Sequence, residues 1–259
     1  MKAIVWSISV LFSLSVFSNP EKEFRTVNNI PFVRGEHLEF VLSYSFINCA
    51  RIVLDITDEK KEFRNRPTYH MVGTGKTLGG FNWLFKVDDR YESFMDEQAM
   101  FPWYAVRKVD EDGFKMHQNI SYLQHKNLAK IEGKEYSIEE NAQDLLGAFY
   151  YCRTMDFSKA KPGDIFTIPT FFDFENHNLQ VKFLGKEVIS TTFGNFNTLK
   201  FMPIVQEGRV FKEKEDMNIW LSDDENKVPI RLKTDLLFGH LKADLVVAKN
   251  LKKPLNRVK

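Results

Sequence analysis

Four charged residues on one short segment are the first candidates for chemistry: Asp88, Asp89, Arg90 and Glu92. Such acids can bind a cation or a hydroxyl-rich ligand, and two carboxylates facing one cleft about 5 to 9.5 Å apart can hydrolyse a glycoside. On a β-strand, however, Asp88, Arg90 and Glu92 share one face, while Asp89 and Tyr91 share the other. We therefore favour cross-strand ion pairs on a solvated face over a binding site.

A second acidic group, Asp223 to Asn226, suggests a calcium-binding loop. Calcium needs about six to eight oxygen ligands and a glycine where the loop bends sharply. This segment is short and contains no glycine, so we predict a hairpin turn.

The sequence contains no known metal, nucleophile or nucleotide motif. It has no HExxH, CxxC, GxSxG, P-loop or dinucleotide-binding pattern. The six histidines, none at ligand spacing from another, are His37, His70, His117, His125, His177 and His240. We therefore predict no catalytic residue, no metal ligand and no cofactor, and expect a protein that is not an enzyme.

The N-terminus has the pattern of a secretory signal peptide. Lys2 precedes a mostly apolar run from Ala3 to Phe17, and polar residues follow from Asn19. We expect residues 1–18 to be removed and the protein to be exported to the periplasm, with no transmembrane segment remaining. Cys49 and Cys152 can pair in an oxidising compartment, but the sequence leaves the disulfide open.

Charge is balanced along the chain, with 36 Lys and Arg against 35 Asp and Glu. This balance gives no reason to expect nucleic acid as a partner. The exception is the basic tail over residues 249–259, which we expect to be a solvated, frayed terminus. With a lead-in over residues 19–34, one β-rich domain fills residues 35–248, because no linker composition divides it.

Apolar and polar residues alternate along most of this domain, which predicts β-strands at regular spacing. The predicted strands are Leu38–Tyr44 and Ile52–Ile56, paired in a hairpin around Asn48 and Cys49, then 68–74, 87–95, 103–109, 114–123, 128–136, 165–172, 178–184, 186–192, 197–206, 217–222, 228–234 and 241–247. Trp220, Phe238 and Leu245 are expected core residues. Short links imply a curved antiparallel meander that closes into a barrel-like or half-barrel sheet.

One segment breaks the alternation and predicts the principal helix. Ser137 and Glu140 match a capping box, and Leu145 and Phe149 belong to an apolar series at helical spacing. We expect this helix over 138–154, with its apolar stripe packed against the sheet.

Several segments resemble one exported bacterial family, the domain of unknown function 3108. They are DDRYESFMD at 88–96 with Phe101-Pro102, DLLGAFYY at 144–151 with Arg153, PGD at 162–164, GNFNT at 194–198, WLSDD at 220–224 with VPI at 228–230, and FGHLKADL at 238–245. The resemblance covers roughly Gly35 to Val247. It implies an exported, single-domain fold with a curved or barrel-like sheet, and no catalytic residue.

Aromatic side chains make up 14% of the chain, including 24 Phe, and they must fill a thick core or line an apolar cavity. We interpret the protein as a non-enzymatic envelope protein that binds an apolar or amphipathic ligand such as an acyl chain. The candidate binding residues are Phe40, Tyr44, Leu145, Phe149 and Phe171. The alternative is a structural or assembly factor of the envelope with a solid core and no small-molecule ligand.

Overall fold

The computed structural model describes residues 23–81, 83, 85–204, 217–236 and 239–258. The expected signal peptide over residues 1–18 and Phe238 lie outside these residues. Within them the chain forms sixteen strands, one α-helix and two 3-10 helices. In chain order these are β1 (His37–Tyr44), β2 (Ile47–Ile56), β3 (Lys61–Phe63), β4 (Arg66–Thr77), η1 (Gly79–Phe81), β5 (Asp88–Asp96), β6 (Pro102–Glu111), β7 (Phe114–Leu123), η2 (Gln124–Lys126), β8 (Leu128–Ile131), β9 (Lys134–Ser137), α1 (Leu145–Thr154), β10 (Ile165–Phe172), β11 (Glu175–Thr191), β12 (Gly194–Ile204), β13 (Asn218–Ser222), β14 (Pro229–Asp235), β15 (His240–Lys249) and β16 (Arg257–Val258).

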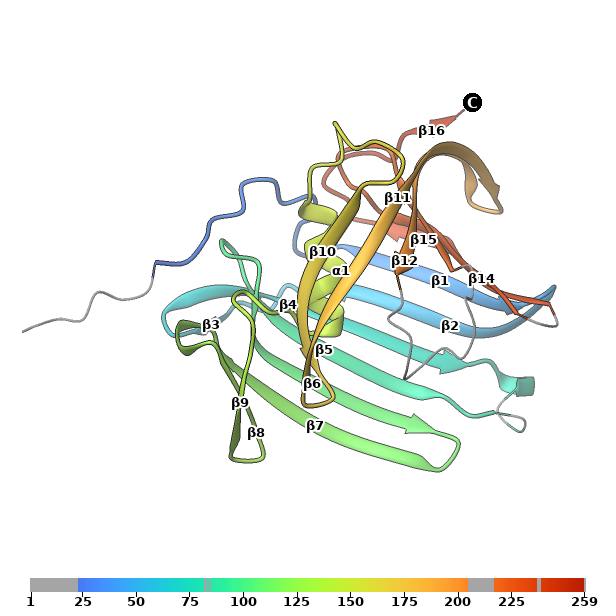
Figure 1. Ribbon diagram of the computed structural model, residues 1–259. Coiled ribbons are helices and arrows are strands. Elements are labelled where there is room, and N and C mark those ends of the chain that lie inside the picture. Colours follow the sequence, from blue (N-terminus) through green and yellow to red (C-terminus); the bar gives the residue numbers. More distant parts are fainter. Residues whose placement is uncertain (1–22, 82, 84, 205–216, 237–238, 259) are drawn as a thin grey trace, which may run out of the picture.

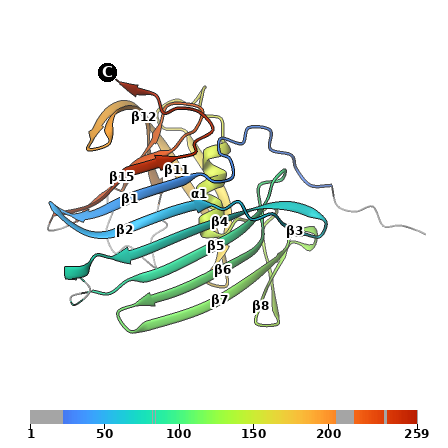
Figure 2. The same ribbon diagram turned by 180° about the vertical axis from the view of Figure 1, so that it is seen from behind.

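The strands form one antiparallel sheet in the order β10-β11-β12-β13-β14-β15-β1-β2-β4-β5-β6-β7-β8-β9, with β3 beside β4 and β16 beside β12. This confirms the predicted fold class of a curved antiparallel meander with one principal helix. Figure 1 shows β10 and β11 crossing in front of α1, with β1, β2 and β4–β7 behind it. Figure 2 shows these latter strands from their other side, as a broad surface with α1 behind it. The sheet is therefore curled around the helix.

The two ends of the sheet are connected by the chain that precedes the helix. The Ile138 N–H donates to the carbonyl of Asn127, next to β8, at 2.9 Å. Gln143 forms a parallel bridge with Thr170 of β10, and the Phe171 N–H donates to the Gln143 carbonyl at 2.9 Å. The sheet is thus curled without closing strand to strand, and residues 138–143 span the gap.

The helix begins later than the sequence predicts. It was expected from Ile138 but begins at Leu145, because Asn141 has a left-handed φ of 59° and Asp144 is extended. The effective cap is Asp144, whose carboxylate accepts a hydrogen bond from the Gly147 N–H at 2.8 Å. The capping-box prediction at Ser137 is therefore wrong.

Three strand predictions also need correction. The first hairpin turns at Ser45 and Phe46, so Asn48 and Cys49 lie within β2. Residues 128–136 form two strands, because Glu132 and Gly133, both with positive φ, make a turn between β8 and β9. The predicted strands 178–184 and 186–192 are one strand, β11, interrupted by a register shift between Phe183 and Gly185.

The basic tail is anchored, which contradicts the expected frayed terminus. β16 pairs with β12, and the Lys253 N–H donates to Asn226 Oδ1 at 3.0 Å. Asn226 in turn donates to the Lys253 carbonyl at 3.0 Å. Residues up to 258 are therefore part of the folded domain.

The main core lies between α1 and the inner face of the curled sheet. Leu146 and Tyr150 of the helix pack in one cluster with alternate residues of the strands, including Leu38, Phe40 and Leu245. A separate cluster joins Phe157, which follows α1, to side chains of β10, β11 and β12, including Phe201. The alternation that predicted the strands thus also determines which side chains meet the helix.

Candidate ligand-binding cavity

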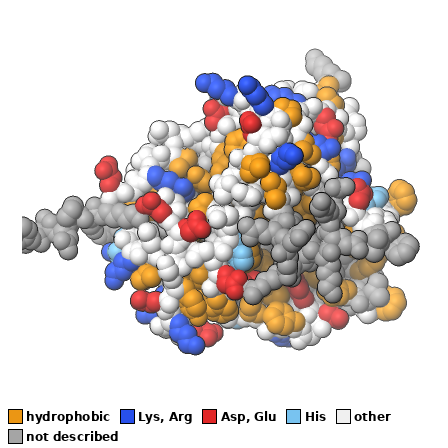
Figure 3. Space-filling view, in the orientation of Figure 1, with side chains coloured by type: hydrophobic (Ala, Val, Ile, Leu, Met, Phe, Trp, Pro, Cys, Tyr) orange, Lys and Arg blue, Asp and Glu red, His pale blue; other side chains and the backbone are white. Residues whose placement is uncertain are grey.

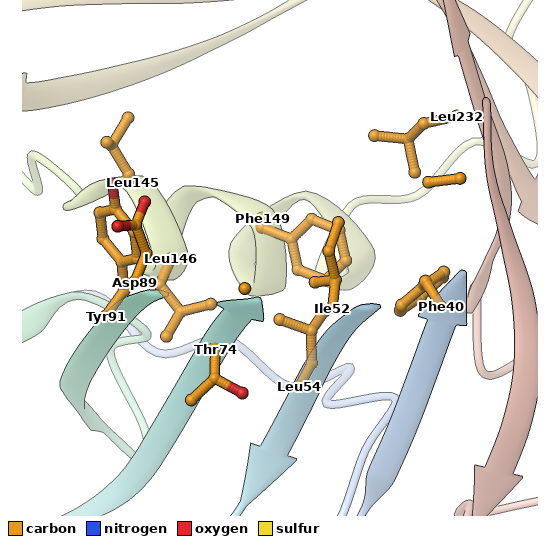
Figure 4. A pocket seen from close by; sticks show the side chains of 13 residues that line it. Phe40, Ile52, Leu54, Thr74, Asp89, Tyr91, Leu145, Leu146, Phe149 and Leu232 are labelled. Atoms are coloured by element: carbon orange, nitrogen blue, oxygen red, sulfur yellow. The ribbon is translucent and has the colours of Figure 1, made fainter. Parts of the chain in front are cut away.

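A cavity of about 360 Å³ lies between α1 and the inner face of the sheet. Figure 4 shows the helix on one side of it and β1, β2, β4 and β5 on the other. Its wall is formed mainly by apolar side chains. The lining residues are Phe40, Ile52, Leu54, Gly73, Thr74, Gly75, Asp89, Tyr91, Leu145, Leu146, Phe149, Leu232 and Ala243.

Two glycines of β4 shape the floor of the cavity in different ways. A Cβ atom at Gly73 would lie 3.2 Å from Leu54 Cδ2 and 3.4 Å from Leu146 Cδ1, so this glycine permits close packing. A Cβ atom at Gly75 would meet no other heavy atom within 4 Å. Gly75 pairs with Ile52 on one side and with Asp89 on the other. The side chain missing at Gly75 therefore leaves room within the cavity.

The helical wall is held in place by Asp144. Ser93 Oγ donates to Asp144 Oδ2 at 2.5 Å, and the Gly147 N–H donates to Oδ1 at 2.8 Å. Burial raises the pKa of Asp144 to about 6, although both hydrogen bonds act in the opposite direction. This buried cap fixes the first turn of α1, which carries Leu145 and Leu146 to the cavity wall.

One end of the cavity is polar. Asp89 and Tyr91 lie beside each other below Leu145 in Figure 4. Burial raises the pKa of Tyr91, Asp89 raises it further, and Arg107 acts in the opposite direction. The arrangement is an apolar chamber with a carboxyl group and a phenol at one end, which suits an amphipathic molecule.

The structure brings together three of the five predicted binding residues. Phe40, Leu145 and Phe149 line the cavity. Tyr44 lies at the end of β1 and is 40% exposed, outside the cavity wall. Phe171 is buried in a separate cluster, where its carbonyl accepts a hydrogen bond from the Tyr122 hydroxyl at 2.8 Å.

Sequence reasoning missed the polar end and both glycines. The signal for the polar end was present, because strand alternation had placed Asp89 and Tyr91 on the face opposite Asp88. Nothing local indicated Gly75 or Leu232, because their role depends on which strands become neighbours.

The outer face of the same strands carries the ion pairs expected from the charged segment. Lys76 Nζ lies 3.1 Å from Asp88 Oδ1 on the neighbouring strand, and His70 Nε2 lies 2.8 Å from Glu92 Oε2. Arg90 also pairs with Glu92, at 2.7 Å. Figure 3 shows the opposite side of the molecule, where acidic and basic side chains are also interspersed.

The other chemical candidates have structural roles. In the acidic turn between β13 and β14, Asp224 Oδ1 accepts hydrogen bonds from the Asn226 N–H at 2.9 Å and from Ser222 Oγ at 2.8 Å, as expected for a hairpin turn. Cys49 and Cys152 are free thiols, and burial raises the pKa of Cys152 to about 12. Within the described ranges, no group of three or more His, Cys, Asp and Glu side chains is placed to hold a metal ion.

A family model described as protein of unknown function (DUF3108) matches residues 39–246. The chain belongs to this family. The matched region runs from β1 to β15 and includes every residue that lines the cavity. A search of curated proteins finds no match.

The chain was also compared with solved structures, and one of them shares its fold. The chain is similar to a β-barrel-like protein of domain of unknown function DUF1849 from Brucella abortus, at 11% identity and a TM-score of 0.54, over 88% of this chain and 100% of that one. It also matches a DUF1089 family protein from Pseudomonas aeruginosa, at 10% identity and a TM-score of 0.40, over 72% and 90% of the two chains. A hypothetical protein from Chlamydia trachomatis matches at 8% identity and a TM-score of 0.38, over 88% and 93%. The first of these likenesses establishes a barrel-like fold for the chain.

In the part of the chain that the structure describes, no helix has the length and apolar character to cross a bilayer.

Proposed function

We propose that this protein binds an apolar or amphipathic ligand, such as an acyl chain, between α1 and the curled sheet. The observation that carries the proposal is the cavity of about 360 Å³, whose walls are formed mainly by apolar side chains. Ligand pockets of proteins have volumes of about 300 to 1,000 Å³ and combine apolar walls with a few polar groups.

An apolar ligand would gain free energy in this cavity because its methylene groups leave water. Each buried methylene contributes about 0.8 kcal/mol. Phe149 from the helix and Ile52 from β2 face the same space in Figure 4, so both would contact the chain of such a ligand. The N-terminus has the pattern of an export signal, which supports binding in the cell envelope. Acyl chains are abundant there.

The test is a titration of the protein with the neutral fluorescent dye N-phenyl-1-naphthylamine, followed by displacement with primary alkanols of increasing length. We expect the dye to bind with a Kd of about 1 µM, or about −8 kcal/mol. Each added methylene should strengthen alkanol binding by roughly fourfold until the cavity is full. The proposal would be contradicted if the dye did not bind, or if alkanols of all chain lengths displaced it equally well.

Matched variants separate cavity binding from adsorption of dye to the surface. Phe149→Asp places a charge in the apolar wall and should abolish dye binding. Phe174→Asp makes the same change at a ring that is 48% exposed and outside the cavity, and it should leave binding unchanged. Circular dichroism must show that both variants are folded.

One observation favours a second function, as an assembly factor of the envelope. Large aromatic side chains are exposed in or next to turns at one end of the sheet: Phe46 is 95% exposed, Trp83 83% and Phe114, the first residue of β7, 60%. In Figure 1 the connections β1–β2, β4–β5 and β6–β7 lie along the same edge. If a variant with serine at all three positions no longer sedimented with envelope membranes, while a variant with a filled cavity still did, this second function would be preferred.

A further inference from the structure

Among the lining residues that the structure describes, Asp89 is the one that is an Asp, Glu, Lys, Arg or His. Its side chain is almost completely buried, at 7% exposure, on the inner face of β5. Figure 4 shows its carboxylate beside Tyr91, at the end of the cavity below Leu145. The polar end of any bound amphipathic molecule that reaches this point meets an acid.

Asp89 accepts a backbone hydrogen bond and has a second carboxyl group beside it. The Asp110 N–H donates to Asp89 Oδ1 at 3.0 Å, which holds the carboxylate in place. Glu111 of β6 is close enough to share a hydrogen bond with Asp89, and burial together with this neighbour raises the pKa of Glu111. Arg107 forms a hydrogen bond with Tyr91 and an ion pair with Asp173, at 2.6 Å.

We propose that the cavity selects a ligand whose polar end donates hydrogen bonds and carries no negative charge, such as an alkyl chain that ends in an ammonium or hydroxyl group. This inference rests on the proposed function. A carboxylate can only accept hydrogen bonds, so it pairs with an N–H or O–H of the ligand. An anionic end such as a carboxylate or phosphate is disfavoured there, because two like charges repel strongly where water is scarce.

The experiment compares three ligands of equal chain length: dodecylamine, 1-dodecanol and dodecanoate. Each ligand is titrated against N-phenyl-1-naphthylamine bound to the full-length mature chain at pH 7.4. Its concentration is kept below the critical micelle concentration of that ligand. We expect dodecylamine to bind most tightly and dodecanoate at least about tenfold more weakly, since an opposite charge nearby shifts such equilibria by one or more powers of ten.

Asp89→Asn tests the residue directly and can still accept the hydrogen bond from the Asp110 N–H. This variant should weaken dodecylamine binding about tenfold, strengthen dodecanoate binding and leave dodecanol nearly unchanged. Asp88→Asn, on the outer face of the same strand, is the matched control and should keep the wild-type order.

The outcomes distinguish the two proposals. If the dye and all three ligands fail to bind, the proposed function itself fails. If all three bind equally to the wild type, or if Asp89→Asn keeps the wild-type order, the cavity still binds apolar chains and the selection by Asp89 is refuted. Near-UV circular dichroism of Asp89→Asn, with Asp89→Glu as a second variant that restores the amine preference, excludes loss of folding as the cause.

Discussion

Arg153 and Glu36 form a bidentate ion pair inside the protein. Arg153 Nη1 lies 2.6 Å from Glu36 Oε1, Nη2 lies 2.9 Å from Oε2, and both side chains are at most 1% exposed. The guanidinium also donates to the Asn226 carbonyl, at 3.1 Å from Nη2. The last turn of α1 is thereby tied to the residue before β1 and to the turn before β14.

Glu36→Gln should destabilise the protein by about 3 to 5 kcal/mol, because it leaves the charge of Arg153 buried without its counter-ion. Urea unfolding at neutral pH measures this change. The double variant Glu36→Leu with Arg153→Met should lose less stability than Glu36→Gln, because it leaves neither charge of the pair buried in the protein. A cost below about 1 kcal/mol for Glu36→Gln would mean that water reaches Arg153.

Asp144→Asn should change how stability depends on pH. The pKa of Asp144 lies at about 6, above its ordinary value of 3.8, because burial opposes ionisation. Folding thus favours the protonated form of Asp144. The stability that this preference contributes is complete below about pH 3.8 and is lost as the pH rises through about 6. Relative to the Asn variant, which still caps the helix, the wild type should lose about 2 to 3 kcal/mol between pH 4 and pH 7.5. Parallel pH profiles of the two proteins in urea melts would contradict this account.

Trp220→Ala should cost about 3 to 5 kcal/mol, as expected for a buried tryptophan. The ring is 6% exposed on β13, its Nε1–H donates to Glu187, and the Lys200 ammonium lies 5.0 Å from the ring centre. Thermal or urea unfolding reports the change. Trp220→Phe keeps most of the apolar surface and should therefore lose clearly less stability. Equal losses of stability in the two variants would mean that the effect comes from the hydrogen bond to Glu187.

Alternation along the chain was sufficient to predict most of the sheet. In β5, for example, it correctly divided Asp89 and Tyr91 from Asp88, Arg90 and Glu92, because a strand turns successive side chains to opposite faces. Trp220 and Leu245 are buried as expected, and both belong to strands with strong patterns.

Features that depend on distant contacts were not predictable from local patterns. Ser137 and Glu140 fit a capping box, yet the chain there pairs with Asn127 and with β10 instead of forming a helix. The cavity also depends on contacts between distant parts of the chain. Gly75 leaves room only because β4 lies between β2 and β5, and Leu232 reaches the cavity although β15 separates its strand, β14, from β1.

The central claim is that the space beside Gly75 holds a ligand, and filling that space tests it most directly. Gly75→Leu projects a side chain into the cavity without a clash at Cβ, and Gly75→Ala is the matched control for the change in backbone freedom. Titration of N-phenyl-1-naphthylamine into the wild type and both variants is the measurement. We predict that Gly75→Leu loses at least about tenfold in affinity while remaining as stable as the wild type, and that Gly75→Ala binds nearly as the wild type does. Equal affinity in all three proteins would contradict the account.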